Sequence, residues 1–298
     1  MHSSTPAPLN LPMSQIKAVG VVGAGQMGGG IAQVAAQSGF ATVLYDAFPK
    51  AIDRAKANHQ KFMAKGVEKG KITQGDMDAA LKRITYASKL EDLSGVDIVV
   101  EAVVEDAKAK TDLFKQLAGM LDKDQILASN TSSISITELA ASVGPAADRF
   151  IGMHFFNPVP IMKLVEVIKG LATSPETTER TIALATAMGK TPVPANDRPG
   201  FVSNRVLMPL INEAFYAWME GVAEPKDIDE IMKLGCNHPM GPLRLADFIG
   251  LDTCVHIMDV LADGLNNDRY RACPLLKQLV AAGRMGDKSG RGVYEYAR

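Results

Sequence analysis

Gly23-Ala24-Gly25-Gln26-Met27-Gly28 is the stretch of sequence that decides the fold. It follows a short apolar run, Ile16 to Val22, which predicts a buried strand, and it precedes an alanine-rich helical segment, Ile31 to Ser38. In such a unit the first glycine allows a tight turn, the second lets a pyrophosphate approach the backbone, and the third permits close packing. The helix N-terminus offers N–H groups to the phosphates. We therefore predict a dinucleotide site that includes Gly23, Gly25, Gln26, Met27 and Gly28.

An acidic residue at the end of the next predicted strand indicates which dinucleotide binds. Asp46 follows the run Ala41 to Tyr45 and lies 18 residues after Gly28. This separation is close to the value of about 20 expected for an acid that binds the adenine ribose hydroxyls. The carboxylate would repel a 2′-phosphate, and Ala47-Phe48-Pro49 supplies no arginine to receive one. We therefore expect the cofactor to be NAD rather than NADP.

Strand and helix patterns alternate along the chain up to about residue 195, which predicts a parallel sheet with helices on both faces. The further apolar runs are Ile98 to Ala102, Ile126 to Ser129, Phe150 to His154, Leu164 to Ile168 and Thr191 to Val193. Beyond the turn at Asp197-Arg198-Pro199-Gly200 only helical patterns appear. We expect an α/β fold with a Rossmann-type, mostly parallel sheet domain over 13–199 and an all-helical C-terminal domain over 200–298. Residues 1–12 read as an extension outside both.

Composition excludes several classes of protein. Hydrophobic residues make up 47% and charged residues 22% of the chain, and the formal net charge is -1. This balance, without basic runs or long apolar stretches, predicts no nucleic-acid partner and no membrane span. The three cysteines form no CxxC pair, so reduced thiols in a cytoplasmic protein are expected. No cluster with metal-ligand spacing is present, so we predict no metal site.

Polar side chains follow the predicted strand Ile126 to Ser129, at the sheet edge where ligands bind. Asn130-Thr131-Ser132-Ser133 comes first, and Ser135 with Glu138 then has the spacing of a capping box for the next helix. Capping explains the later residues but not Asn130 through Ser133. We favour function over a structural explanation for that stretch, without excluding the latter.

A histidine and a glutamate lie 12 residues apart, on two neighbouring predicted strands. His154 suits proton transfer near neutral pH, although a lone histidine after a strand is more often structural. Glu166 stands among β-branched residues, where a buried carboxylate is costly without a partner. A His154–Glu166 pair would satisfy both groups, because the carboxylate fixes the imidazole tautomer and stabilises its protonated form. Asn204, in the first turn of a mostly apolar helix, is a third polar candidate.

The motifs together resemble a known family. GAGQMGGGIA, VVEAVVED, SNTSS, HFFNPVPIMKLVEV, RPGFVSNR and HPMGPLRLAD occur in this order. They resemble the L-3-hydroxyacyl-CoA dehydrogenases, most of all the short-chain 3-hydroxybutyryl-CoA enzymes, over nearly the whole chain from Ile16 to Tyr296. One departure is Gly29, which lengthens the glycine run and should weaken the helix by about 1 kcal/mol relative to alanine.

The resemblance implies NAD-dependent oxidation of a 3-hydroxyacyl-CoA, with His154 as general base and Glu166 as its orienting partner. Ser132 and Asn204 would bind the substrate. Residues near the nicotinamide half of the cofactor would be Glu105, Lys110, Asn130, Ser132, Asn157 and Lys288. Lys65 and Lys69 would contact coenzyme A phosphates, although a lysine face is usually only solvated.

Two other functions stay open from the sequence. One is a dehydrogenase of a free hydroxy acid or sugar acid, and the other is a non-catalytic NAD-binding protein of the same fold. The apolar content of the C-terminal helices also predicts a homodimer formed through that domain.

Overall fold

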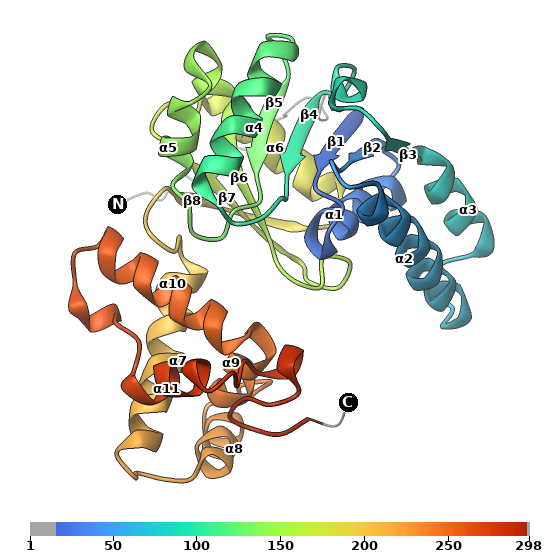
Figure 1. The fold of residues 1–298 in the computed structure, drawn as a ribbon. Coiled ribbons are helices and arrows are strands. Elements are labelled where there is room, and N and C mark those ends of the chain that lie inside the picture. The colour runs from blue at the N-terminus through green and yellow to red at the C-terminus, as the bar shows by residue number, and fades with distance from the viewer. Residues whose placement is uncertain (1–15, 297–298) are drawn as a thin grey trace, which may run out of the picture. The chain divides into compact units, whose positions relative to one another are not determined.

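The structure, a computed structural model, describes residues 16–296. These residues form two compact units that divide between Asp197 and Arg198 (Figure 1). The predicted extension over residues 1–12 lies outside the described residues.

The first unit is built on one eight-stranded sheet in the order β3-β2-β1-β4-β5-β6-β7-β8. The strands are β1 Ala18–Val22, β2 Ala41–Tyr45, β3 Ile84–Ala87, β4 Ile98–Glu101, β5 Ile126–Ser129, β6 Phe150–Phe155, β7 Leu164–Lys169 and β8 Thr191–Asn196. The order reverses between β1 and β4, and this switch point is where ligands bind in open α/β sheets. The mostly parallel Rossmann-type sheet predicted from the sequence is confirmed.

One strand runs against the expected direction. β7 was expected to continue the parallel pattern, but it pairs antiparallel to β6, while β7 and β8 are parallel to each other. Only residues 156–163 connect β6 to β7. A parallel crossover needs a dozen or more residues, so this short connection forces the antiparallel pairing.

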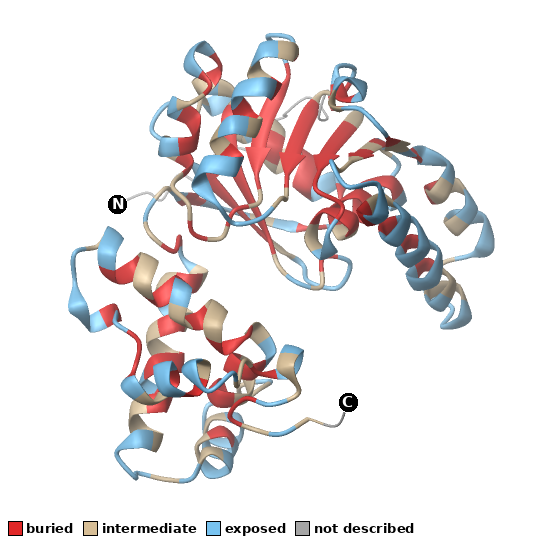
Figure 2. Cartoon of the chain, viewed as in Figure 1, coloured by how far each residue is buried: buried red, intermediate tan, exposed pale blue. Residues whose placement is uncertain are grey.

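Helices cover both faces of the sheet (Figure 1). They are α1 Gln26–Gln37, α2 Pro49–Glu68, α3 Gln74–Arg83, α4 Ala107–Met120, α5 Ile136–Ala141 and α6 Pro175–Ala187. Alternate strand residues, such as Ile98 and Val100, share one buried core with α1 and α6. Phe114 of α4 meets Phe150 of β6 edge to face, with ring centroids 4.6 Å apart, on the other side. The central strands are accordingly buried, whereas the edge strand β8 and the outer sides of the helices are mostly exposed (Figure 2).

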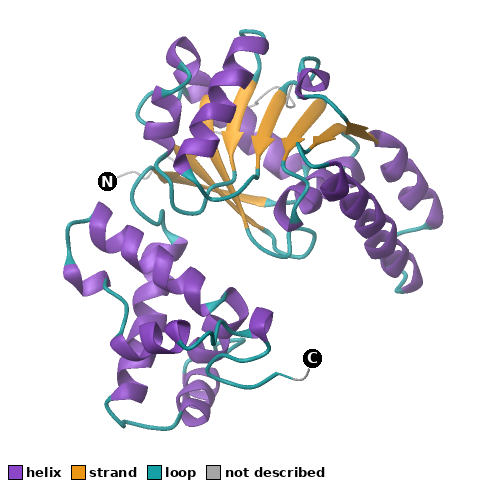
Figure 3. Ribbon diagram, viewed as in Figure 1, coloured by secondary structure: helices purple, strands orange, loops and turns teal. Residues whose placement is uncertain are grey.

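The second unit consists mainly of helices around its own apolar core (Figure 3). They are α7 Ser203–Met219, α8 Pro225–Gly235, α9 Pro242–Ile249, α10 Leu251–Gly264 and α11 Pro274–Ala281. The all-helical character predicted for this region is confirmed. The sequence patterns did not predict α9, which has only eight residues.

Candidate active site

The glycine motif forms the turn from β1 into α1, and its glycines are required by shape. Gly23 has a φ of +102°, and a Cβ there would lie 2.5 Å from the carbonyl oxygen of Ala102. A Cβ on Gly28 would lie 1.8 Å from the carbonyl oxygen of Gly23. Because neither position can hold a side chain, α1 begins directly against the end of β1.

The start of α1 fits the pyrophosphate of a dinucleotide. A Cβ on Gly25 would meet no atom within 4 Å, so the space beside its backbone is open. No side chain caps the helix and no acidic residue stands in its first turn, which leaves its first N–H groups to a ligand. Asp46 accepts hydrogen bonds from Ala24 N at 2.7 Å and Phe48 N at 2.8 Å. These bonds hold the Asp46 carboxylate, predicted to bind the ribose, beside the glycine turn.

His154 and Glu166 are brought together by the antiparallel pairing of β6 and β7. They are direct cross-strand neighbours, and His154 Nδ1 lies 2.7 Å from Glu166 Oε2. Both side chains are buried, with His154 8% and Glu166 3% exposed. A buried carboxylate at this distance accepts the proton of Nδ1–H, which fixes the tautomer and leaves Nε2 as the basic nitrogen.

The serine-rich stretch after β5 wraps around a single carboxylate oxygen. Glu105 Oε1 accepts hydrogen bonds from the backbone N–H of Ser132 at 2.8 Å and from the hydroxyls of Thr131 at 2.6 Å and Ser132 at 3.2 Å. The N–H and hydroxyl of Ser133 also donate to it. So many donors on one oxygen require Glu105 to be ionised. The carboxylate therefore holds Ser132 in place.

A buried ion network stands behind Glu105. Lys110 Nζ lies 2.6 Å from Glu101 Oε1 and 3.2 Å from Glu105 Oε2. Glu101 also accepts from the hydroxyl of Ser129 at 2.6 Å and is 0% exposed. Burial alone would raise the pKa of Glu105, but the Lys110 ammonium and the hydrogen bonds from Thr131 and Ser132 outweigh it and lower that pKa.

Glu101 is the member of this network that the sequence reasoning did not single out. A charged residue inside the apolar run of β4 was the available signal, because a carboxylate there needs a buried partner. The network shows that Glu101 is the counter-ion of Lys110.

Asn130 and Asn157 each accept a hydrogen bond near the ends of the strands, the first from a backbone N–H and the second from a side chain. Asn130 Oδ1 accepts from Phe155 N at 2.9 Å, which ties the end of β5 to β6. Asn157 Oδ1 accepts from Gln26 Nε2 at 2.9 Å, so the segment after β6 touches the first residue of α1. These contacts place both asparagines at the edge that carries His154 and the glycine turn.

Comparison with known proteins agrees with this geometry. Residues 18–198 match the family model described as 3-hydroxyacyl-CoA dehydrogenase, NAD binding domain, and residues 200–296 match the corresponding C-terminal domain. The chain belongs to the 3-hydroxyacyl-CoA dehydrogenase family. It is an NAD-dependent oxidoreductase.

Relatives of this family resemble the chain over almost all of its length. A probable 3-hydroxybutyryl-CoA dehydrogenase of Bacillus subtilis is 56% identical over 282 residues, which cover 95% of this chain and 98% of that protein. The mitochondrial hydroxyacyl-coenzyme A dehydrogenase of Homo sapiens is 41% identical, and the match covers 99% of this chain and 96% of that protein. The crystal structure of (S)-3-hydroxybutyryl-CoA dehydrogenase from Ralstonia eutropha matches with a TM-score of 0.93 and 49% identity, covering 95% and 100% of the two chains.

The predicted coenzyme A residues lie on the surface of the first unit. Lys65 is in the last turn of α2 and Lys69 follows the helix end, and both are exposed. Neither forms an ion pair with a carboxylate within residues 16–296. His59, on the buried side of α2, has partners in Gly29 O at 2.8 Å and Tyr86 OH at 2.9 Å, so it is a structural residue.

Two predicted residues belong to the second unit. Asn204 lies in the first turn of α7 and is 8% exposed. Lys288 forms an ion pair with Asp252 at 2.5 Å. Within this unit, therefore, Asn204 is buried by the helix packing and Lys288 is held by a carboxylate.

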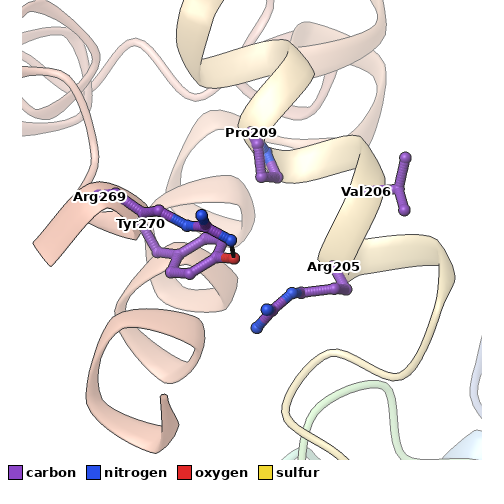
Figure 4. A pocket seen from close by; sticks show the side chains of 5 residues that line it. All are labelled: Arg205, Val206, Pro209, Arg269 and Tyr270. Atoms are coloured by element: carbon purple, nitrogen blue, oxygen red, sulfur yellow. Dashed lines mark hydrogen bonds between the residues drawn. The ribbon is translucent and has the colours of Figure 1, made fainter. Parts of the chain in front are cut away.

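The second unit also has a hollow of about 430 Å³ lined by Arg205, Val206, Pro209, Arg269 and Tyr270 (Figure 4). The guanidinium carbons of Arg205 and Arg269 lie 4.7 and 4.6 Å from the centroid of the Tyr270 ring. These contacts are cation–π interactions with one ring. None of the residues predicted to bind cofactor or substrate lines this hollow.

Within residues 16–296 no three His, Cys, Asp or Glu side chains gather as metal ligands would. No helix described there is long and apolar enough to cross a bilayer.

Proposed function

We propose that the protein oxidises short-chain (S)-3-hydroxyacyl-CoA, such as 3-hydroxybutyryl-CoA, to the 3-oxoacyl-CoA, and reduces acetoacetyl-CoA in the reverse direction. The observation that carries the proposal is the buried hydrogen bond of 2.7 Å between His154 Nδ1 and Glu166 Oε2. A histidine held in one tautomer by a carboxylate is an effective general acid and base. The names of the relatives with 56% and 49% identity support the short-chain substrate.

His154 moves the proton in this mechanism. Its Nε2 removes the proton of the substrate 3-hydroxyl, while Glu166 accepts the Nδ1–H bond and stabilises the positive charge that develops on the ring. NAD, when bound, supplies the acceptor for the hydride that leaves the substrate carbon. In the reverse direction the protonated His154 returns its Nε2 proton to the 3-oxo oxygen.

The remaining residues position the reactants. Ser132, held by Glu105, and Asn204 bind the substrate oxygen and the thioester end. The residues assigned to the nicotinamide side of the cofactor are Glu105, Lys110, Asn130, Asn157 and Lys288. Lys65 and Lys69 receive the coenzyme A phosphates, for which their exposure and lack of ion pairs in the described residues leave them available. Orientation of two reactants contributes much of the acceleration in such reactions.

The test is the oxidation of NADH, followed by absorbance at about 340 nm. Acetoacetyl-CoA is compared with free acetoacetate, and NADPH replaces NADH in a control. We expect rapid loss of absorbance only with the CoA ester and NADH. Equal activity with the free acid would favour a hydroxy-acid dehydrogenase, and binding of NADH without any turnover would favour a non-catalytic protein.

We also propose a cytoplasmic homodimer formed through the helical second unit. Val206, Ile231 and Leu234 of that unit are 67%, 62% and 77% exposed, and apolar side chains in such numbers favour an interface. Light scattering should give twice the mass of the chain, and a monomer would contradict the proposal.

A further inference from the structure

Lys190, just before β8, carries an ammonium group that is buried without an acidic partner. The residue is 8% exposed, and no carboxylate within residues 16–296 lies in ion-pair distance of it. Its Nζ donates to the carbonyl oxygens of Val159 and Met162, the latter at 2.8 Å. Burial, with a smaller contribution from Lys163, lowers the pKa of Lys190. Burying a charge of this kind is costly unless hydrogen bonds compensate it, and here the two carbonyl oxygens supply those bonds.

Both acceptors belong to the segment 156–163 between β6 and β7, here called the β6–β7 loop. Ile161 N and Met162 N both donate to Pro158 O, at 2.9 and 3.0 Å, so the loop contains a single helix-like turn. Carbonyl groups at the C-terminal side of such a turn need donors from elsewhere and attract cations. Lys190 supplies both the donors and the charge.

The same loop contacts α1, the helix that begins at the phosphate-binding glycines. Asn157 Oδ1 accepts from Gln26 Nε2 at 2.9 Å. Val159 is 2% exposed and packs on α1 at Gly30, where a Cβ would lie 2.9 Å from the Cβ of Val159. The loop is therefore hydrogen-bonded to Lys190 at one side and contacts α1 at the other.

We infer that Lys190 is a positioning residue for the cofactor: its ammonium fixes the β6–β7 loop so that Asn157 and Val159 meet α1, and it thereby sets the affinity for NAD and NADH. The inference rests on the proposed role of Asn157 on the cofactor side. The loop joins the strands of His154 and Glu166, but their own pairing along β6 and β7 holds them together. The effect is therefore larger on cofactor affinity than on kcat.

The experiment compares Lys190→Met with Lys190→Arg and with Lys163→Met. Lys163 is exposed and is the last residue of the same loop. Lys163→Met therefore also removes one positive charge, but it leaves the buried hydrogen bonds of Lys190 in place. NADH affinity is measured by fluorescence titration, and loop order by amide hydrogen exchange of residues 156–163 without cofactor. We expect Lys190→Met to bind NADH about tenfold more weakly and to exchange faster in the loop. Lys190→Arg and Lys163→Met should stay within about threefold of the parent.

NADH affinity of Lys190→Met within twofold of the parent overturns the inference, as does an equal loss in Lys163→Met. If the methionine variant does not fold, Lys190→Gln, which is too short to reach both carbonyls, carries the same expected loss. Because the readouts are binding and exchange, they decide on Lys190 even if acetoacetyl-CoA proves not to be a substrate. Absence of acetoacetyl-CoA turnover would instead contradict the proposed function.

Discussion

The two halves of the site are built from different kinds of group. Where β1 meets α1 the site is backbone, and a Cβ added to Gly28 would lie 1.8 Å from a carbonyl oxygen. Where β6 pairs with β7 the site is side chains, with His154 and Glu166 joined at 2.7 Å. Cofactor binding should be lost when an atom is added to the first half, and catalysis should be lost when a group is removed from the second half. Binding and chemistry should therefore be separable by mutation.

The largest expected effect on cofactor binding comes from adding one methyl group to the backbone half. Gly28→Ala must push α1 away from β1, because the new Cβ would overlap Gly23 O. Overpacking of this kind costs about 1–3 kcal/mol, and if this cost falls on the cofactor-binding conformation, NADH affinity should fall by roughly 5- to 150-fold. Fluorescence titration measures the loss. Unchanged affinity would show that the glycine is not required by shape.

In the side-chain half, Glu166→Gln keeps a hydrogen-bond acceptor but removes the charge that stabilises the protonated His154. We expect kcat to fall by about 10²-fold while NADH affinity is kept. Steady-state kinetics and fluorescence titration separate the two quantities. Glu138→Gln, at an exposed position of α5, is the control and should leave both unchanged. A matching fall in NADH affinity would mean that the two halves are not separable.

A smaller effect is expected at Glu105, which holds the serine stretch between the two halves. Its pKa is lowered in the folded protein from an ordinary value of 4.5. The resulting stability is therefore present above pH 4.5 and is lost as the pH falls through the lowered pKa. Urea unfolding measures the free energy of unfolding at neutral and at acidic pH. We expect this free energy to fall less on acidification in Glu105→Gln than in the parent. An equal fall in the free energy of unfolding in both proteins would show that Glu105 does not contribute to the pH dependence of stability.

The smallest effect is expected at the neighbouring glycine, and it is the matched control for Gly28. A Cβ on Gly29 would lie 3.7 Å from His59 Nε2 and 3.8 Å from Ala55 Cβ, which is ordinary contact. Gly29→Ala should therefore stabilise the protein by about 0.5–1 kcal/mol through helix propensity. Thermal unfolding measures this gain, and NADH affinity should stay within about twofold. Destabilisation would show that the extra glycine has a packing role.

Much of the backbone half could be predicted because its determinants are local. The glycine spacing, the apolar run before it and Asp46 after the next strand all lie within about one βαβ unit. Only the start of α1 differed, at Gln26 rather than Ile31, since glycine lowers helix propensity but close packing here overrides it. β3 was not predicted, because its four residues follow α3 with no turn between them.

The side-chain half depends more on tertiary pairing. The spacing of His154 and Glu166 predicted their contact, since each needed a partner, but not the antiparallel direction of β7 that makes them cross-strand neighbours. Glu101 and Lys190 were missed because their partners lie on other elements. The apolar run of β4 shows that Glu101 needs a partner, but it does not identify Lys110 as that partner.

The most direct test of the account is His154→Ala, assayed for acetoacetyl-CoA reduction and for NADH binding on the same preparation. The account predicts a fall in kcat of about 10²- to 10⁴-fold with NADH affinity unchanged, because the residue supplies the proton and does not hold the cofactor. Turnover close to that of the parent, with NADH still bound, would contradict it.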